Sequence, residues 1–445
     1  MAHTLEHIVL SAQKRLQFEQ IQTSKGSRLD LHKPLPLFSL QVNDSLLFSS
    51  DWRFNDQNRF QWANTLSGKI EVDSTFEEGW KANITFTNEK DTTISIANVV
   101  PLGQTGDHIY ITASGPWSLA RSKIFFPDKG PIGVILPDNA WELGYSDWRL
   151  DAENGLCTMT RRIGVREGKA QRWQTVLQPG GQVVYQLYAD LYKGRWQEGL
   201  RLMFQDRYLY DVKQFDNALF QRSDLQWVRR MYAMVLMYAW DHDFYDTHKR
   251  RYTYPAFLDR AEKYLGGWDA FALWPTWPTL GIDQRNQWDL YGDLPGGLSR
   301  VREIADDMQN RNTRFFVSYN PWDQSTRYVD PYEGLSDLIR NTNADGVVLD
   351  TYGHSSDSLQ QAADTVKKGV CMYSEGMAVP KNMQGIISGR VHNAIVMPPP
   401  LNLNKLIKPD FTIMRVAQLK DHYLHRELAL SFFNGYGTEL NVMSP

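Results

Sequence analysis

Two carboxylates occupy matching places in the second half of the chain, each directly after an apolar run. Asp350 follows GVVL and Glu375 follows VCMYS, so they are 375 − 350 = 25 residues apart. Two carboxyl groups held a few ångströms apart suit acetal hydrolysis. One attacks or stabilises the anomeric carbon, while the other, with a raised pKa, protonates the leaving oxygen. Either carboxylate alone has a plainer alternative, which is to cap the following helix.

The elements that must position this pair are short apolar runs alternating with helical segments from about residue 230 onward. Such runs, apolar nearly throughout, are typical of buried parallel strands. Because the interval of 25 residues fits one loop, one helix and the next strand, the pair should lie on neighbouring strands. Eight runs with helices between them predict a (β/α)₈ barrel; they span 234–240, 268–275, 313–320, 344–350, 369–375, 393–400, 410–416 and 438–443.

In such barrels the active site lies at the carboxyl ends of the strands, and polar and aromatic residues gather there. Adjacent strand ends favour a short carboxylate separation and therefore retention of configuration. Aromatic rings pack against the C–H faces of sugars, although large aromatics are also common in cores. The candidate substrate-binding residues at these ends are Asp241, Asp243, Trp274, Trp277, Asp289, Asn320, Trp322, Tyr352, His354, His392 and Arg415.

The first half of the chain has a different sequence pattern. Alternating runs such as KIEVDSTF and WKANITFTN, separated by turn residues, predict an antiparallel β-sandwich over 33–192. Residues 1–32 form a leader segment, read as a short helix or a frayed end, and 193–229 read as connecting helices. The barrel then fills 230–445, with its last strand at the end of the chain. The predicted fold is therefore multidomain β plus α/β.

Composition excludes several classes of protein. The 445 residues carry 48 Lys+Arg against 51 Asp+Glu, a net charge of −3 that offers no basic footprint for nucleic acid. Cys157 and Cys371 are the only cysteines, too few for a disulfide framework. No apolar run approaches the roughly 20 residues that span a bilayer. No signal peptide is recognised, so the chain as written is expected in the cytoplasm, or secreted or periplasmic if it is a fragment.

The segments GVVLDTYG and CMYSEG, which carry Asp350 and Glu375, resemble the layout of the alpha-amylase family. A β-sandwich leading into such a barrel is also similar to the endo-alpha-N-acetylgalactosaminidase family. The resemblance implies an alpha-glycosidase with an aspartate nucleophile, Asp350, and a glutamate acid/base, Glu375. At Val348 the sequence departs from the alpha-amylase pattern, which has an arginine two residues before the nucleophile.

The working hypothesis is a retaining glycoside hydrolase that needs no cofactor and acts on an oligosaccharide or glycoconjugate. Two alternatives stay open. A degenerate barrel would bind carbohydrate without cleaving it, or a metal-dependent hydrolase would be built around Asp241 and Asp243, although their spacing matches no common metal motif.

Overall fold

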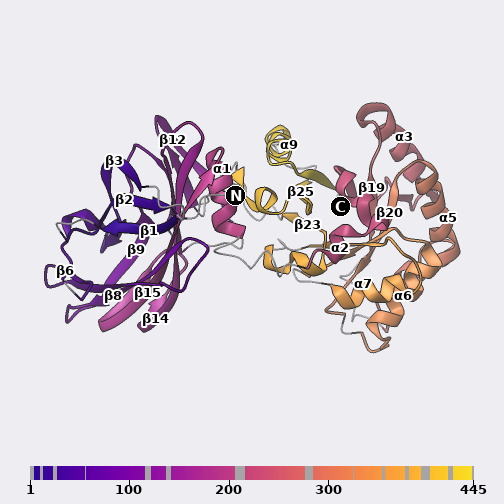
Figure 1. Ribbon diagram of the computed structural model, residues 1–445. Coiled ribbons are helices and arrows are strands. Elements are labelled where there is room, and N and C mark those ends of the chain that lie inside the picture. Colours follow the sequence, from indigo (N-terminus) through magenta and orange to yellow (C-terminus); the bar gives the residue numbers. More distant parts are fainter. Residues whose placement is uncertain are drawn as a thin grey trace. The chain divides into compact units, whose positions relative to one another are not determined.

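The computed structural model describes residues 5–10, 14–23, 28–55, 57–115, 122–136, 142–205, 216–275, 284–323, 325–352, 356–375, 380–391, 401–418 and 424–442. The chain forms two compact units, one of residues 1–214 with 397–403 and one of residues 215–396 with 404–445 (Figure 1). No helix in the described ranges has the length and apolar character to cross a membrane.

The first unit is built from strands. A three-stranded antiparallel sheet consists of β1 (Leu5–Leu10), β2 (Gln17–Thr23) and β3 (Arg28–Pro36). The expected leading helix is therefore wrong: β1 and β2 occupy that segment. The helix α1 (Trp196–Leu202) follows the last long strand of this unit.

The remaining strands of this unit form a 13-stranded sheet in which almost all neighbours are antiparallel, which confirms the antiparallel prediction; the sandwich arrangement stays a prediction. Strand β8 has strictly alternating burial, as expected for a strand with one face on a core. The sheet comprises β4 (Phe38–Val42), β5 (Ser45–Phe48), β6 (Arg59–Trp62), β7 (Leu66–Val72), β8 (Trp80–Asn88), β9 (Ile94–Pro101), β10 (Ile109–Ala113), β11 (Ser122–Phe126), β12 (Lys129–Ile135), β13 (Leu143–Arg149), β14 (Asn154–Ala170), β15 (Thr175–Lys193) and β24 (Leu401–Asn402).

An aromatic cluster lies in the core of this unit. Phe38 of β4 meets the ring of Phe86 of β8 edge-on, with centroids 5.4 Å apart, and Trp52 stacks on Phe60 at 5.3 Å. All four side chains are buried. Such ring pairs add to the free energy of burying apolar area, so this core holds the β unit together without any help from disulfides, since the buried Cys157 is not disulfide-bonded.

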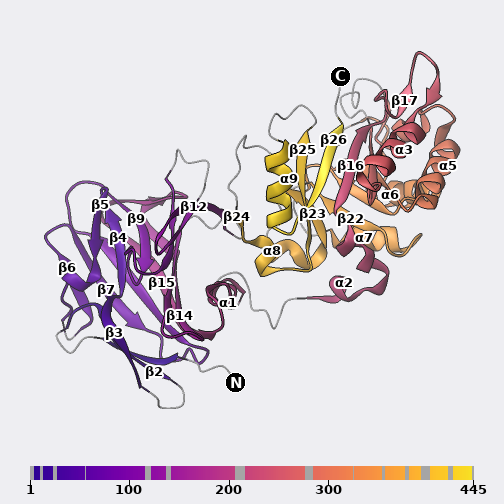
Figure 2. The ribbon, with the colours of Figure 1, turned by 90° about the horizontal axis from the view of Figure 1, so that it is seen from above.

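The second unit contains a closed barrel of eight parallel strands, as the sequence predicts. Figure 2 shows the neighbouring strands β25, β26 and β16 where the barrel closes. The strands, in order around the barrel, are β16 (Ala233–Tyr238), β19 (Ala270–Trp274), β20 (Arg314–Tyr319), β21 (Gly346–Leu349), β22 (Cys371–Ser374), β23 (Ser388–Val391), β25 (Thr412–Gln418) and β26 (Gly437–Val442).

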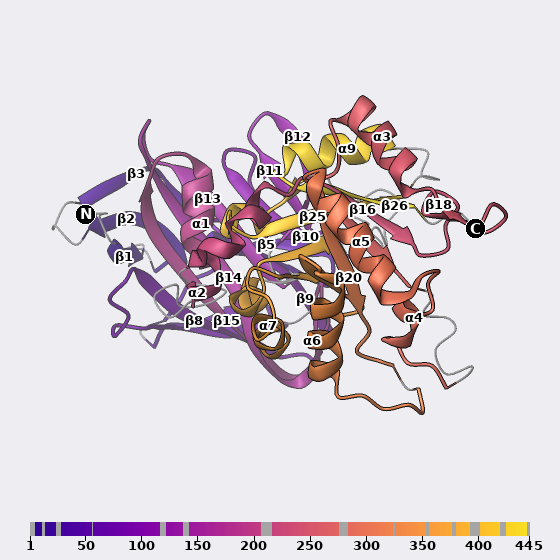
Figure 3. The ribbon, with the colours of Figure 1, turned by 90° about the vertical axis from the view of Figure 1, so that its right-hand side faces the viewer.

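Helices cover the outside of the barrel, and α5, α6 and α7 lie next to one another (Figure 3). The longer helices of this unit are α3 (Tyr254–Leu265), α5 (Gly297–Asn310), α6 (Pro331–Thr342), α7 (Asp357–Asp364) and α9 (Leu424–Phe433). Short elements fill the connections: α2 (Ala218–Gln221), η5 (Ser223–Arg230), β17 (Tyr245–Asp246), β18 (Arg251–Tyr252), α4 (Asp289–Gly292), η7 (Pro380–Gly385) and α8 (Asn404–Ile407).

The sixth barrel strand differs from the prediction. Residues 393–400, which lie outside the described residues, were expected to form it, but the strand is Ser388–Val391. The expected run ends in Pro398, Pro399 and Pro400, which have no N–H to donate to a strand ladder. Beyond it, residues 397–403 belong to the first unit, where β24 pairs with β12. A loop between two barrel strands thus contributes a strand to the β unit.

Candidate active site

Strand register puts the carboxylate pair on the inner wall of the barrel. Val348 is level with Ser318 of β20 and with Tyr373 of β22. Side chains alternate along a strand, so the residues two positions further along face the same side. These are Asn320, Asp350 and Glu375, at the carboxyl ends of three adjacent strands, where barrel active sites lie.

The two carboxyl groups are in direct contact through a hydrogen bond between the Asp350 and Glu375 side chains. Asp350 is only 5% exposed. Burial, together with the hydrogen bond to and repulsion from Glu375, raises the pKa of Asp350 to about 8, against an opposing effect of Arg390. At neutral pH Asp350 therefore keeps its proton, and one protonated carboxyl group is the state expected when two carboxylates share a site.

The backbone beside Asp350 takes part in holding the pair. Thr351 has a left-handed conformation with φ of 52°, which is unusual for a β-branched residue. Its N–H donates to Glu375 Oε2 at 2.6 Å. Non-glycine residues in this region are retained where the surroundings impose the conformation, often at functional sites.

Arg390 of β23 links the pair to the barrel interior. One guanidinium nitrogen, Nη2, donates to Glu375 Oε1, and Nη1 donates to Glu439 Oε1 at 2.6 Å. The guanidinium carbon also lies 5.8 Å from the ring centroid of Trp274, within the range of a cation–π interaction. Arg390 thus joins the last residue of β19 to Glu375 after β22 and Glu439 within β26.

Glu439 has a second partner in the barrel interior. The hydroxyl of Tyr373 donates to Glu439 Oε2. Glu439 is fully buried and Tyr373 is equally inaccessible, and burial, followed by the nearby charge of Glu439, raises the pKa of Tyr373 well above its usual value. Tyr373 therefore remains a neutral donor that satisfies one oxygen of a carboxylate buried inside the barrel.

The buried polar atoms without a hydrogen-bond partner among the described residues include Asn320 Nδ2, Arg390 Nε and Asn441 Oδ1. Asn441 lies two residues after Glu439 on β26 and therefore faces the same side. Leaving a buried polar atom unpaired costs free energy. A hydroxyl group that reached these atoms would satisfy the two donors and the acceptor.

Several predicted residues also lie at strand ends. Trp274 is buried beside Arg390. Asn320 accepts from Trp322 N through its Oδ1 at 2.8 Å, and Trp322 is 45% exposed. Tyr352 has a pKa raised by burial and then by neighbouring Tyr332 and Asp357. Trp277, His354 and His392 lie outside the described residues.

Two other predicted residues are engaged in ion pairs. Asp289 Oδ2 pairs with Arg327 at 2.9 Å and accepts the N–H of Asn286, so it shapes its own loop. Arg415, predicted to bind substrate, is placed differently: its Nε donates to Glu427 of α9, on the outside of the barrel. Both of these groups are buried.

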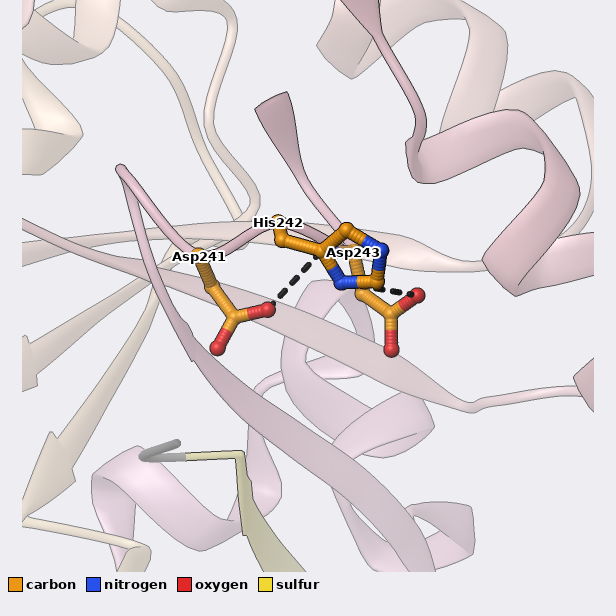
Figure 4. A group of neighbouring side chains, drawn as sticks. All are labelled: Asp241, His242 and Asp243. Atoms are coloured by element: carbon orange, nitrogen blue, oxygen red, sulfur yellow. Dashed lines mark hydrogen bonds and ion pairs between the residues drawn. The ribbon is translucent and has the colours of Figure 1, made fainter. Parts of the chain in front are cut away.

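Asp241, His242 and Asp243 form, within the described ranges, a group with ligand atoms within 4.8 Å of one another (Figure 4). Asp241 Oδ1 accepts the N–H of Asp243 at 2.8 Å, and Asp243 Oδ1 pairs with Arg260 of α3 at 2.8 Å. His242 is exposed. These contacts describe a tight turn whose second carboxylate already has a cationic partner, so the group carries no metal assignment.

Arg390 and Glu439 are functional candidates that the sequence interpretation missed. Each is a charged residue inside an apolar barrel strand, Arg390 in IISGRV and Glu439 in TELNV. That was the available signal, because a charge is almost never fully buried without a partner. Arg390 was missed because the sixth strand was predicted at 393–400, beyond this residue.

No protein-family model matches the sequence, and no curated protein matches it. Among solved structures, the chain is similar to the ligand-free alpha-N-acetylgalactosaminidase NagBb from Bifidobacterium bifidum, at 10% identity over 98% of this chain and 88% of that chain, with a TM-score of 0.47. It is also similar to the alpha-amylase from Geobacillus thermoleovorans complexed with acarbose, at 13% identity over 48% of this chain and 70% of that chain (TM-score 0.32). A variant of a Glycoside Hydrolase Family 97 enzyme from Pseudoalteromonas sp. strain K8 aligns at 9% identity over 86% of this chain and 68% of that chain (TM-score 0.31). All three are glycoside hydrolases, the class that the sequence resembles.

Proposed function

We propose that this protein is a retaining glycoside hydrolase that cleaves an alpha-linked O-glycosidic bond of an oligosaccharide or glycoconjugate. The observation that supports the proposal is the hydrogen-bonded pair Asp350–Glu375, which carries one proton at neutral pH at the carboxyl ends of adjacent barrel strands. Glycoside hydrolysis needs one protonated and one ionised carboxyl group on either side of the scissile bond.

In the proposed mechanism, Asp350 attacks the anomeric carbon while Glu375 gives its proton to the departing oxygen. Glu375 then removes a proton from water, whose oxygen attacks the anomeric carbon and releases Asp350. Asp350 and Glu375 follow neighbouring strands of the barrel, and neighbouring strand ends favour the shorter carboxyl separation of retaining enzymes over the wider inverting one. Because the pKa of Asp350 is raised to about 8 and Arg390 pairs with Glu375, this mechanism requires a proton to pass from Asp350 to Glu375 as the sugar enters.

The same proposal assigns binding roles to the rim. Trp274 and Trp322 would pack against sugar faces, and the free Nδ2 of Asn320 would donate to a hydroxyl. Asp241 and Asp243 would accept hydrogen bonds from sugar hydroxyls at the end of the first barrel strand. The further sequence-based candidates, kept as proposals, are Trp277, Asp289, Tyr352, His354 and His392.

A panel of nitrophenyl glycosides tests the proposal. Asp350→Ala is expected to lower kcat by at least about 10⁴-fold, because it removes the group that forms the covalent intermediate. Glu375→Ala is expected to keep turnover of substrates with good leaving groups, which need no protonation, and azide should raise it further because azide attacks the glycosyl-enzyme without needing a general base. Asp364→Ala, a carboxylate paired with Arg222 outside the barrel wall, serves as the control and should keep wild-type turnover.

Two outcomes would contradict the assignment. Full activity of Asp350→Ala would exclude it as the nucleophile, and a glycosyl azide of retained configuration from Asp350→Ala instead of Glu375→Ala would exchange the two roles. Sugar binding by calorimetry without any product would favour the non-catalytic carbohydrate-binding alternative.

A further inference from the structure

A chain of four hydrogen-bonded side chains crosses the barrel interior. The Tyr373 hydroxyl donates to Glu439, Glu439 accepts from Arg390 Nη1 at 2.6 Å, and Arg390 Nη2 donates to Glu375. The exposed fractions of the Arg390 and Glu439 side chains are 2% and 0%. These groups come from β22, β23 and β26, so the chain exists only because the barrel is closed.

Arg390 stabilises negative charge on the two carboxylates that its guanidinium contacts. A buried guanidinium needs an anionic partner, and its planar fork presents separate N–H groups to two carboxylates. Glu439, with Tyr373 on its other oxygen, takes one side of Arg390. Glu375 takes the other side, and its second oxygen accepts the N–H of Thr351. Both Glu375 oxygens thus accept hydrogen bonds from groups outside the pair, whereas the nearest cation faces Glu375 rather than Asp350.

We infer that Arg390, anchored by Glu439, is a positioning residue that keeps Glu375 ionised in the substrate-free pair and so places the shared proton on Asp350. The inference deepens the proposed glycosidase function and rests on it for its catalytic meaning. Arg390 acts through Glu375. Because it favours the proton on Asp350, substrate entry must move that proton to Glu375 before the first step.

Other ionisable groups face this pair as well, and they enter the expected titration. Glu439 from β26 and Tyr373 and Cys371 from β22 lie in the same interior, and Cys371 Sγ is 3.0 Å from Ser388 Oγ. Burial, opposed by the hydrogen bond to Ser388, raises the pKa of Cys371 to about 12. Tyr373 and Cys371 therefore stay neutral near pH 8, so Arg390 and Glu439 are the charges of this set that act on the pair.

The barrel offers a matched control for Arg390. Arg415, on the next strand, makes a comparable buried pair with Glu427, with exposed fractions of 3% and 4%. That pair faces α9 instead of the barrel interior. Replacing Arg415 therefore tests the loss of a buried Arg–Glu pair without changing the charge beside Asp350 and Glu375.

The experiment follows the side-chain carboxyl carbons of Asp and Glu by ¹³C NMR during a pH titration of the full chain, with Asp350→Asn and Glu375→Gln used to assign the signals. In the wild type, the Asp350 signal should titrate near pH 8. In Arg390→Met, the pKa at which the pair loses its proton should rise by about one unit or more. The signal of a protonated carboxyl group should then no longer be confined to Asp350. Glu439→Gln should lower the pKa of the pair, because it removes a nearby negative charge. Arg390→Lys should give a pKa close to the wild-type value, and Arg415→Met should leave the pKa of the pair unchanged.

Arg390→Met leaves Glu439 buried without its cation, which is costly enough to risk unfolding. The double variant Arg390→Met/Glu439→Gln removes both buried charges and so avoids the unpaired Glu439. Because it still lacks the cation beside Glu375, the proton should again be distributed over both carboxyl groups and not confined to Asp350. An Asp350 titration in that variant equal to the wild type would overturn the inference.

Failure of the inference and failure of the proposed function give different results. An unmoved titration in an enzyme that cleaves glycosides overturns the role of Arg390 alone. The expected shifts in a protein that cleaves no glycoside support the positioning role and count against hydrolysis.

Discussion

Two neighbouring carboxyl groups that share one proton are the central feature at the scale of single residues. Burial and the neighbouring Glu375 raise the pKa of Asp350, while Arg390 and the N–H of Thr351 donate hydrogen bonds to Glu375. The same contacts that suit catalysis cost stability, because the folded protein must bind a proton that the unfolded chain releases above its ordinary pKa near 4.

Stability should therefore depend on pH through Asp350. Its pKa is about 8 in the folded protein, so its contribution is fully present below about pH 4 and is lost as the pH rises through 8. Asparagine cannot titrate, so the free energy of unfolding of Asp350→Asn relative to the wild type should increase from pH 4 to pH 8 and then level off. Urea unfolding at fixed pH values measures this difference.

Asp224 provides the control with the opposite sign. The hydrogen bond from Arg222 lowers the pKa of Asp224, so its stabilising contribution is already complete above the unfolded pKa. Asp224→Asn should lower stability by an amount that does not change between pH 5 and pH 9. A flat difference for Asp350→Asn over the same range would contradict the shared-proton description.

At the scale of elements, α6 supports the rim of the barrel. Asp330 caps its start by accepting from Tyr332 N and Glu333 N, and Pro331 occupies the first turn. Gly334 lets the helix approach Trp288, because an added Cβ would lie 2.3 Å from Trp288 Cε2. Trp288 in turn lies 6.1 Å from the ring of Tyr319, the last residue of β20. The helix thus positions aromatic rings beside the strand that leads into Asn320.

Gly334→Ala should displace Trp288 and destabilise the protein by about 1–3 kcal/mol, the usual cost of overpacking. The tryptophan fluorescence maximum should shift as this ring moves. Gly292 of α4 is the matched control, since nothing lies within 4 Å of a Cβ added there. Gly292→Ala should stabilise the helix by up to about 1 kcal/mol. Equal effects of the two substitutions would show that Trp288 does not depend on Gly334.

At the scale of the whole molecule, the chain passes between its two units more than once. The segment 397–403, which lies in sequence between barrel strands β23 and β25, belongs to the β unit. There β24 pairs in parallel with β12, and Leu403 N donates to Ile135 O at 3.1 Å. This pairing covers a strand edge that would otherwise be open to other chains.

Leu403→Pro should open that edge, because proline cannot donate the hydrogen bond to Ile135. Amide hydrogen exchange in β12 should become faster, and the full chain should aggregate more readily on heating. Leu403 is buried, so Leu403→Ala is the control: it loses apolar contacts but keeps the N–H and should leave exchange in β12 much closer to the wild type. Equal exchange in both variants would contradict a role for this hydrogen bond.

Local signals in the sequence were sufficient for most of the architecture. Seven of the eight predicted apolar runs overlap barrel strands, because a parallel strand buried on both faces must be apolar along its length. The same pattern located Asp350 and Glu375, since each ends such a run. The sixth run was wrong because an apolar composition alone does not show which segment forms the barrel strand, which is Ser388–Val391.

The charges around the pair depend on contacts between distant residues. Arg390 and Glu439 are 49 residues apart, and nothing in either local segment indicates that they meet. Arg415 has the same residue type one strand further on, yet the alternation of side chains turns it outward to Glu427. The sequence alone determined which residue types stand at the strand ends; barrel closure and strand register decided which of them share a proton, because both depend on hydrogen bonds between strands that are remote in the chain.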